Sequence, residues 1–250
     1  VSADVTDAEQ TRAAVLRIEA ALGPITAVLH GAGANVPQLL TSLDEAAFME
    51  IVKPKLHGLR HVLAAVKPDR LSLLVAFGSI IARMGLPGEA HYATANDWLA
   101  EDVDRWQRGH PHCRCLTLEW SVWSGVGMGY RLGRVDVLAQ QGVTPIPTDE
   151  GLRQFRRLLA QPTPSRVVVT GRFGDPPTLS MEERELPLRR FVEHARVDYP
   201  GVELVVDVDL SGEGDPYLGD HVFSGTRLFP AVMGLEAMAQ VAMTLTGAVE

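Results

Sequence analysis

The chain has 250 residues, of which 46% are hydrophobic and 22% are charged. That composition is ordinary for a globular protein and supplies enough apolar surface for one large domain or two small ones. A formal net charge of −8 argues against nucleic acid or an anionic membrane as the main partner. With two cysteines and no run near the ~20 apolar residues of a transmembrane helix, we expect a cytoplasmic protein without disulfides, without a nucleic-acid partner and without a membrane partner.

Most of the chain alternates between helical and strand patterns. An acidic first turn opens the first helix, and short apolar runs bounded by turn residues predict buried strands. The patterns predict helices over 7–21, 43–64, 89–108 and 148–160, the last capped by Thr148, and strands over 25–30, 71–77, 113–120 and 166–170. Such alternation predicts an α/β fold, a Rossmann-like parallel sheet with helices on both faces.

The chain opens inside a strand pattern, VSADV, with no glycine-rich turn before its first helix. A dinucleotide-binding fold starts with a strand, such a turn and a helix whose N-terminus holds pyrophosphate. We therefore expect that the first βα units of the sheet, about 60 residues, precede this segment in a longer polypeptide.

After the turn-rich run GRFGDPPT at 171–178, the alternation of helical and strand patterns gives way to a strand-rich pattern. This run therefore predicts a domain edge. The following segment, ARVDYPGVELVVDVDLS, has a strand period and a turn at Pro200–Gly201. Residues 231–245 are apolar almost all round, as in a buried helix.

Three polar residues within the run FGSIIARMGLPGEAHYATAN predict a carbonyl-reducing site. Ser79 follows the strand at 71–77, while Tyr92 and Asn96 are four residues apart and share one helix face. A phenol with a pKa near ~10 is a weak acid. It becomes a useful proton donor when a hydroxyl binds the same carbonyl oxygen and a cation lies nearby.

This order of residues resembles the short-chain dehydrogenase/reductase superfamily. Most of its members have a lysine four residues after the tyrosine, where this chain has Asn96. The ketoreductase domains of polyketide synthases have asparagine there and take the lysine from an earlier helix. Lys55, in VKPKLHGLRHV, matches that lysine by its spacing from Gly58. The resemblance extends over about 1–172 of the chain.

The resemblance implies NADPH-dependent reduction of a β-ketoacyl thioester on the phosphopantetheine arm of an acyl carrier protein. Tyr92 would donate the proton, and Ser79 would orient the carbonyl. Lys55 would lower the pKa of Tyr92 and hold the ribose, and Asn96 would support the site and a water relay. Neighbouring synthase domains are the implied partners, in a homodimeric parent synthase.

The resemblance also implies a set of cofactor-binding residues. The segment at 119–129 is expected to close over the nicotinamide. The implied contacts are Asp4 and Val5 in the ADV run, His30, Gly31, Ala32 and Gly33 in the HGAG run, and Lys55 and Tyr92. Neither common marker of product stereochemistry is present, because the loop reads ANVPQLL and Met84 takes the tryptophan position.

A second motif lies near the C-terminus, in DHVFSGTRLFP. His221, Gly225 and Pro230 have the spacing H-x3-G-x4-P, which resembles the first catalytic motif of polyketide-synthase dehydratases with the hot-dog fold. A histidine suits removal of an α-proton at neutral pH. The sequence around this motif resembles that of the iterative polyketide synthases of enediyne biosynthesis. We therefore expect a ketoreductase part at 1–175, a linker at 176–200 and a partial α+β hot-dog segment at 201–250.

Three other interpretations compete with this one. A stand-alone reductase of small carbonyl compounds would leave the C-terminal motif without a role, and a non-catalytic ketoreductase shell would not need the catalytic set. The run HPHCRC at 110–115 has the residue types of a metal site, but its spacing fits no common zinc pattern, so we predict no metal.

Overall fold

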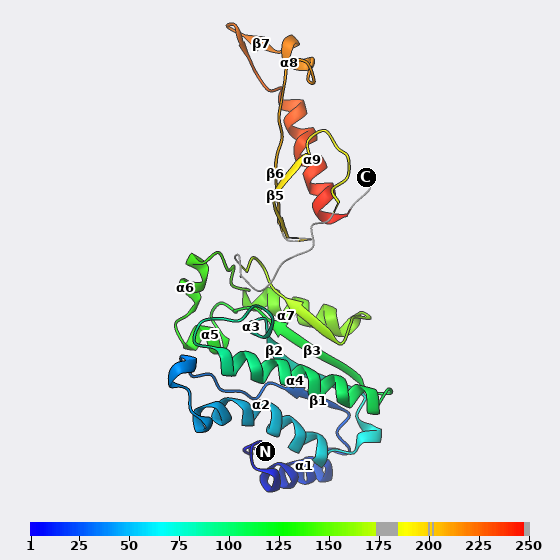
Figure 1. Ribbon diagram of the computed structural model, residues 1–250. Helices are drawn as coiled ribbons and strands as arrows, with labels where there is room; N and C mark the ends of the chain where they lie inside the picture. Colours follow the sequence, from blue (N-terminus) through cyan, green and yellow to red (C-terminus); the bar gives the residue numbers. More distant parts are fainter. Residues whose placement is uncertain (174–184, 200, 202, 248–250) are drawn as a thin grey trace. The chain divides into compact units, whose positions relative to one another are not determined.

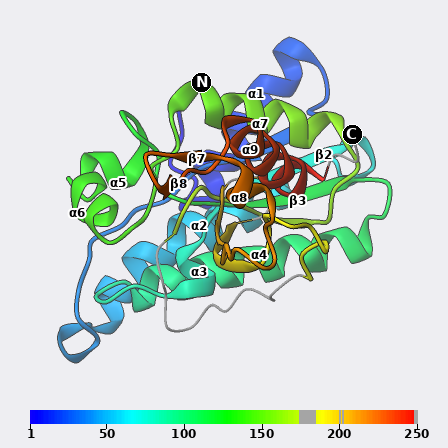
Figure 2. The ribbon, with the colours of Figure 1, turned by 90° about the horizontal axis from the view of Figure 1, so that it is seen from above.

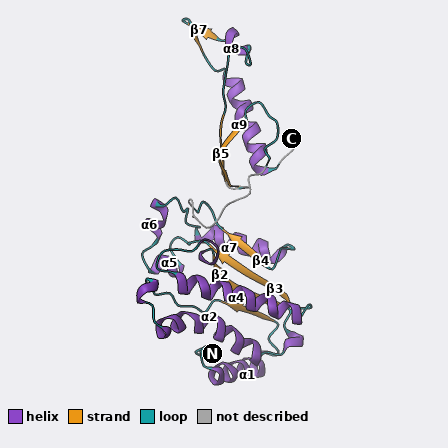
Figure 3. Ribbon diagram, in the orientation of Figure 1, coloured by secondary structure: helices purple, strands orange, loops and turns teal. Residues whose placement is uncertain are grey.

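The computed structural model describes residues 1–173, 185–199, 201 and 203–247. It divides into two compact units, Val1–Ser180 and Met181–Glu250. Figures 1 and 3 show the helices and strands of each unit. No helix in the described part of the chain is both long and apolar enough to cross a membrane.

The first unit alternates helices and strands as the sequence predicts, with predicted bounds within two residues of those observed. Its elements are α1 (Ala8–Leu22), β1 (Ala27–His30), η1 (Leu40–Ser42), α2 (Glu45–Ala65), η2 (Pro68–Arg70), β2 (Leu73–Ser79), α3 (Ile81–Met84), α4 (Ala90–Gly109), β3 (Arg114–Trp120), α5 (Gly127–Arg131), α6 (Val135–Gln140), α7 (Thr148–Ala160) and β4 (Arg166–Val169). The strands pair in the order β1-β2-β3-β4, all in parallel. The predicted parallel sheet is confirmed.

The sheet is covered on both faces because its strands are apolar on both sides. Leu74 in β2 packs into a core with residues of α2 and α4, whereas Val75, the next residue, packs into a second core that α7 covers. Viewed from above, α4 and α7 lie on opposite sides of the strands (Figure 2). This arrangement leaves the carboxyl ends of the strands as the edge where polar residues gather.

The two helices α1 and α7 begin with different caps. Asp7 caps α1 by accepting hydrogen bonds from the backbone of Glu9 and Gln10 at 2.9 and 3.0 Å. The predicted cap at Thr148 is wrong, because Pro147 holds the cap position of α7 and makes no side-chain cap bond. The Thr148 hydroxyl instead donates to the Ser124 carbonyl at 3.2 Å and so ties α7 to the preceding loop.

Both cysteines lie in the core of the first unit at the start of β3. Cys113 and Cys115 are free and buried, with their sulfur atoms 3.8 Å apart. Burial raises the pKa of Cys115 to about 12. The thiols therefore act as small apolar side chains.

The second unit contains a short antiparallel sheet and one long helix. Its elements are β5 (His194–Tyr199), β6 (Glu203–Asp207), α8 (Tyr217–Asp220), β7 (Val222–Phe223), β8 (Thr226–Arg227) and α9 (Ala231–Thr246). The β5–β6 pair confirms the predicted strands. Strand β5 lies in the predicted strand-like segment, within the 176–200 range assigned to the linker. Residues 174–178 of the predicted domain edge and Pro200 of the predicted turn lie outside the described residues.

Helix α9 has the predicted range but not the predicted burial. Val232, Leu235 and Met238 are 69%, 64% and 63% exposed, and Thr244 is its one buried residue among those described. The physical reason is that the β5–β6 pair covers only one stripe of a helix that is apolar nearly all round. The prediction of a buried helix is therefore wrong for the unit as described.

Candidate active site

The four residues predicted for reduction lie together at the carboxyl edge of the sheet. Lys55 comes from α2, Ser79 ends β2, and Tyr92 and Asn96 lie on successive turns of α4. All four are buried, with exposed fractions of 3%, 7%, 8% and 0%. Such burial of polar groups is costly unless they are paired or serve chemistry.

The Lys55 ammonium makes few contacts for a buried cation. Its Nζ donates to the Phe77 carbonyl at 3.1 Å and lies 5.6 Å from the centre of the Tyr92 ring. A side chain at Gly33 would meet Lys55 Cε at 3.2 Å, so glycine leaves room for the lysine. Burial lowers the pKa of Lys55 to about 8, which still leaves most of the ammonium protonated at neutral pH.

The Tyr92 phenol is held in its protonated form. Burial raises the pKa of Tyr92, and hydrogen bonds with Asn96 and Ser79 offset part of that rise. The net direction is upward because removing a phenolate from water is the largest influence. A neutral phenol at physiological pH can act only as a proton donor or hydrogen-bond partner.

The side-chain amide of Asn96 has a hydrogen-bond partner for its nitrogen but not for its oxygen. Its Nδ2 donates to the Tyr92 backbone carbonyl at 2.7 Å, one helical turn earlier. Its Oδ1 is buried without a hydrogen-bond partner among the described residues. An unpaired buried acceptor of this kind suits a bound water or ligand donor.

A half-buried ion pair supports the loop that follows Ser79. The serine Oγ accepts a hydrogen bond from the Ile81 backbone at 3.3 Å. Arg83 on α3 makes two contacts with Glu119 on β3, at 2.7 and 2.9 Å, and the Glu119 side chain is 1% exposed. This bidentate pair joins α3 to the sheet and fixes the backbone next to the serine.

A cavity of about 470 Å³ lies against these residues. Lys55, Ser79 and Tyr92 line it, together with residues of the segment 120–143. That segment includes most of the 119–129 run expected to close over the nicotinamide. Asn35 and Glu89 also line the cavity, and the sequence analysis did not single them out. Glu89 precedes Tyr92 by three residues and so shares its helix face, a signal that could have identified it.

The residues implied for cofactor binding divide between the cavity and its surroundings. Gly31 lines the cavity, whereas the His30 ring is buried beside α2, with Nε2 2.8 Å from the Lys55 carbonyl. Burial lowers the pKa of His30 to about 4, so its ring is neutral. Asp4 accepts hydrogen bonds from the backbone and hydroxyl of Thr6, both at 2.8 Å. The assignment of Asp4, Val5, His30, Gly31, Ala32 and Gly33 to cofactor binding stays a prediction.

The cavity wall suits the nicotinamide end of a cofactor. Ser121 Oγ lies in it, buried without a partner in the described part of the chain, and could bond an amide. The Lys55 ammonium and the Tyr92 hydroxyl are the groups that could bind ribose hydroxyls. The chemical character of these groups fits that cofactor, because neutral donors lie beside the Lys55 ammonium.

The predicted second site has a different local explanation for most of its motif. Ser224 and Gly225 both have positive φ, 49° and 79°, and form the turn of the β7–β8 hairpin, where glycine is favoured. Pro230 is the cap residue of α9. Backbone geometry therefore accounts for Gly225 and Pro230. His221 is exposed, its carbonyl accepts from Leu228 at 2.9 Å, and its ring has no such structural explanation.

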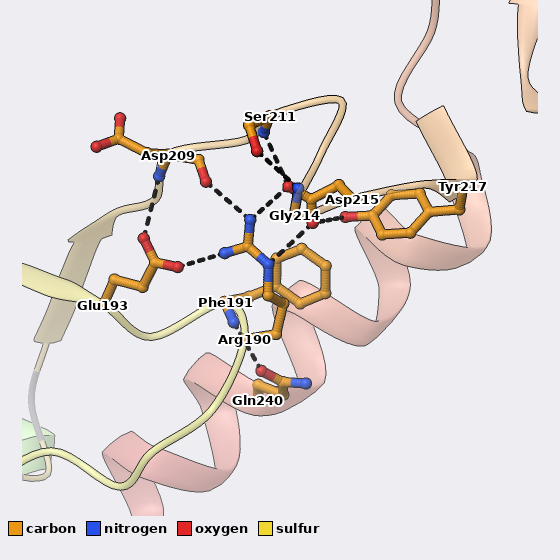
Figure 4. Close-up of polar contacts among 9 residues, drawn as sticks. All are labelled: Arg190, Phe191, Glu193, Asp209, Ser211, Gly214, Asp215, Tyr217 and Gln240. Atoms are coloured by element: carbon orange, nitrogen blue, oxygen red, sulfur yellow. Dashed lines mark hydrogen bonds and ion pairs between the residues drawn. The ribbon is translucent and has the colours of Figure 1, made fainter. Parts of the chain in front are cut away.

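An ion-pair cluster holds the loop that leads to His221 (Figure 4). Asp215 is fully buried, and Arg190 donates to both of its oxygens at 2.9 and 2.6 Å. Asp215 also accepts hydrogen bonds from the Tyr217 hydroxyl and the Ser211 backbone at 2.8 and 2.9 Å. The guanidinium holds the pKa of Asp215 well below its usual range. The cluster is structural, because its donors and acceptors are mutually satisfied.

The HPHCRC run has structural contacts of its own. The His110 ring stacks on Trp106 at 3.8 Å between ring centres, and His112 Nε2 lies 3.1 Å from the Pro68 carbonyl. In the described ranges, no three His, Cys, Asp or Glu side chains are grouped so that they could hold a metal ion.

A parallel sheet with a buried Ser, Tyr and Lys at its carboxyl edge defines the class of short-chain dehydrogenases/reductases. A family model described as the KR domain matches residues 1–125. The chain belongs to this family of polyketide-synthase ketoreductase domains.

Relatives and solved structures agree with this assignment. The chain is 33% identical over 188 residues to the spectinabilin polyketide synthase system protein NorA' of Streptomyces orinoci, covering 74% of this chain and 5% of that protein. It is 29% identical over 138 residues to 6-methylsalicylic acid synthase of Aspergillus terreus, covering 55% of this chain and 8% of that protein. The chain therefore spans a small part of such relatives.

Among solved structures, a ketoreductase domain from the bacillaene assembly line is 27% identical, with a TM-score of 0.58, over 67% of this chain and 41% of that one. An alcohol dehydrogenase from Thermococcus sibiricus, complexed with 5-hydroxy-NADP, shares the fold at 19% identity and a TM-score of 0.56, over 72% of this chain and 75% of that one.

Proposed function

We propose that this chain carries the reductase site of a polyketide synthase, which reduces the β-carbonyl of a carrier-bound acyl thioester to a hydroxyl. The observation that carries the proposal is the presence of Lys55, Ser79 and Tyr92 in the wall of one cavity. The family membership supports the same chemistry. NADPH, the proposed cofactor, supplies a hydride to the carbonyl carbon when it is bound.

The side chains have distinct roles in this reaction. The Tyr92 hydroxyl transfers its proton to the carbonyl oxygen, and its raised pKa keeps that proton available at neutral pH. Ser79 donates a hydrogen bond to the same oxygen. The Lys55 ammonium stabilises the negative charge that the phenol acquires as it gives up its proton. Asn96 holds the α4 backbone at Tyr92 and offers an acceptor to water.

The test is the Tyr92→Phe variant of the full-length protein, assayed with a β-ketoacyl thioester and NADPH. Loss of a proton donor typically costs a factor of about 10² to 10⁴ in rate. The matched control is Tyr130→Phe, because Tyr130 is 54% exposed on α5 and does not line the cavity. If Tyr92→Phe keeps more than about half of the wild-type rate, Tyr92 is not the acid.

The same assay separates the rival functions. A carrier-bound β-ketoacyl substrate should react with higher kcat/KM than a small free ketone, which a stand-alone reductase would not require. NADPH should be preferred over NADH. A non-catalytic shell would reduce neither substrate with either cofactor. We also propose that the protein acts as a cytoplasmic homodimer with neighbouring synthase domains and a carrier protein as partners.

We propose that the second unit belongs to a dehydratase that removes water from the β-hydroxyacyl product, with His221 as the base for the α-proton. The exposed His221 ring, which no backbone role explains, favours this proposal, as does the sequence resemblance to enediyne-type synthases. His221→Ala should then leave reduction intact and leave the β-hydroxyacyl chain on the carrier. The control is His194→Ala, another exposed histidine, on β5. Mass spectrometry distinguishes the two chains by one water, and a normal level of unsaturated chain from His221→Ala would contradict the proposal.

A further inference from the structure

Two polar side chains of the cavity wall leave oxygen atoms unpaired. Glu89 is 2% exposed and Asn35 is half-buried, and both line the cavity. Glu89 Oε2 and Asn35 Oδ1 are buried without a hydrogen-bond partner in the described part of the chain. Buried polar atoms are nearly always paired, so two neighbouring exceptions in one wall point to a bound group that supplies the donors.

Backbone contacts hold these two residues at a fixed place relative to Tyr92. Gln38 donates its backbone N–H to the Gly88 carbonyl at 2.8 Å. The His91 ring nitrogen lies 2.9 Å from the Val36 carbonyl. The loop after β1 is thus tied to the start of α4 on either side of Glu89. Because Tyr92 lies one helical turn from Glu89, the unpaired oxygens and the phenol belong to one rigid frame.

The surroundings of Glu89 favour a donor as its partner. A carboxylate can only accept hydrogen bonds, and the Asn35 oxygen is also an acceptor. Much of the remaining wall is apolar, including Met84, Leu86 and Met128. A ligand that enters this cavity can be mainly hydrocarbon, but it needs a hydroxyl or an N–H where it meets the pair.

We propose that Asn35 and Glu89 bind a hydrogen-bond donor of the acyl thioester substrate, a hydroxyl or an amide N–H, and thereby select and position that substrate. The inference rests on the proposed reductase function and adds a specificity site to it. Two parts of a carrier-bound substrate offer such a donor: a hydroxyl on the growing chain and the amide N–H groups of the phosphopantetheine arm.

The test compares three β-ketoacyl thioesters with the full-length protein and NADPH. The first is a plain S-butyl thioester without a donor, the second its δ-hydroxy derivative, and the third the N-acetylcysteamine thioester, which carries an amide N–H. A hydrogen bond to a charged acceptor predicts a 10- to 100-fold higher kcat/KM, about 1.4–2.7 kcal/mol, for one donor-bearing substrate. The substrate that gains identifies the source of the donor.

The Glu89→Leu variant should reduce that preference, measured as the ratio of kcat/KM for the donor-bearing and plain thioesters within the variant, to less than about threefold. Asn35→Leu tests the partner residue without altering the start of α4, and serves if Glu89→Leu does not fold. The control is Glu45→Leu, an exposed acid in the first turn of α2. A wild type without preference, or a leucine variant that keeps it, overturns the inference. Failure of the wild type to reduce any of the three thioesters instead overturns the reductase proposal beneath it.

The pH dependence of the preference gives a readout that a merely structural role would not move. Burial raises the pKa of Glu89, while Asn35, His91 and Arg134, which face it, act in the opposite direction, and Tyr92 also lies near. The accepting carboxylate exists above that pKa, so the preference should decline as pH falls through it. The decline should occur at a higher pH than an exposed glutamate would produce, and a preference constant across this range counts against the carboxylate as the acceptor.

Discussion

Replacing Lys55 with methionine should stabilise the first unit at neutral pH while it abolishes reduction. The folded protein holds the Lys55 ammonium out of water, which lowers its pKa from 10.5 to about 8. A shift of that size corresponds to a cost of about 3 kcal/mol for the charged form. Methionine keeps the apolar stem and removes the charge, but it forfeits the bond to the Phe77 carbonyl and the contact with the Tyr92 ring, about 1 kcal/mol each. The expected net gain is about 1–2 kcal/mol at pH 7.

The pH dependence has a definite sign. Between pH 8 and 10.5 the unfolded chain binds the lysine proton and the folded chain does not, so the wild type gains stability as pH rises through this window. The Lys55→Met variant lacks this gain. Its advantage over the wild type should therefore shrink by roughly 2 kcal/mol between pH 7 and pH 9.5.

Urea unfolding followed by tryptophan fluorescence measures this difference, because all four tryptophans of the chain, at 98, 106, 120 and 123, lie in the first unit. The control is Lys53→Met, two positions away on the same helix and exposed. If Lys55→Met lowers stability at pH 7 by more than about 1 kcal/mol, or its difference from wild type does not vary with pH, Lys55 is not a charge held at a cost.

Two further substitutions test the packing of each unit. Asp215→Asn should cost the second unit about 2–3 kcal/mol, less than for a fully buried pair because the Arg190 side chain is 31% exposed, and faster hydrogen exchange in that unit checks it. Unchanged exchange there would contradict a structural role. Gly151→Ala places a methyl group 2.4 Å from the Trp123 ring and should cost about 1–3 kcal/mol with altered fluorescence, whereas Gly109→Ala, with no atom within 4 Å, should not. Equal effects of the two alanines would refute the predicted clash.

The sequence predicted the sheet from local patterns, and the residues it proposed for catalysis, Lys55, Ser79 and Tyr92, lie around one cavity. Alternating strands and helices order the fold, and the spacing of Tyr92 and Asn96 places them on one helix face. The sequence analysis did not identify Asn35 and Glu89. They lie in a loop after β1 and at the start of α4, which backbone contacts bring together although the sequence separates them by more than fifty residues. An acidic residue ahead of a helix normally indicates an exposed N-terminal turn.

The burial of α9 and the net pKa of Tyr92 both depend on what surrounds a residue in three dimensions, which a sequence pattern does not give. The predicted burial of α9 is wrong for the described residues. An apolar helix is buried only if partners cover it on every side, and the described strands cover one stripe of α9. A nearby cation lowers the pKa of a phenol and the loss of water raises it, and around Tyr92 the loss of water is the largest influence.

The buried thiols of Cys113 and Cys115 have a practical consequence for ligand binding. They are the only cysteines in the chain, and they lie in the core of the first unit rather than in the cavity. An alkylating reagent can reach them only when this core opens. A ligand that binds the closed form therefore slows alkylation by the factor 1 + [L]/Kd when opening and closing are fast. The rate of thiol modification thus reports occupancy of the cavity without any turnover, including in the Tyr92→Phe protein.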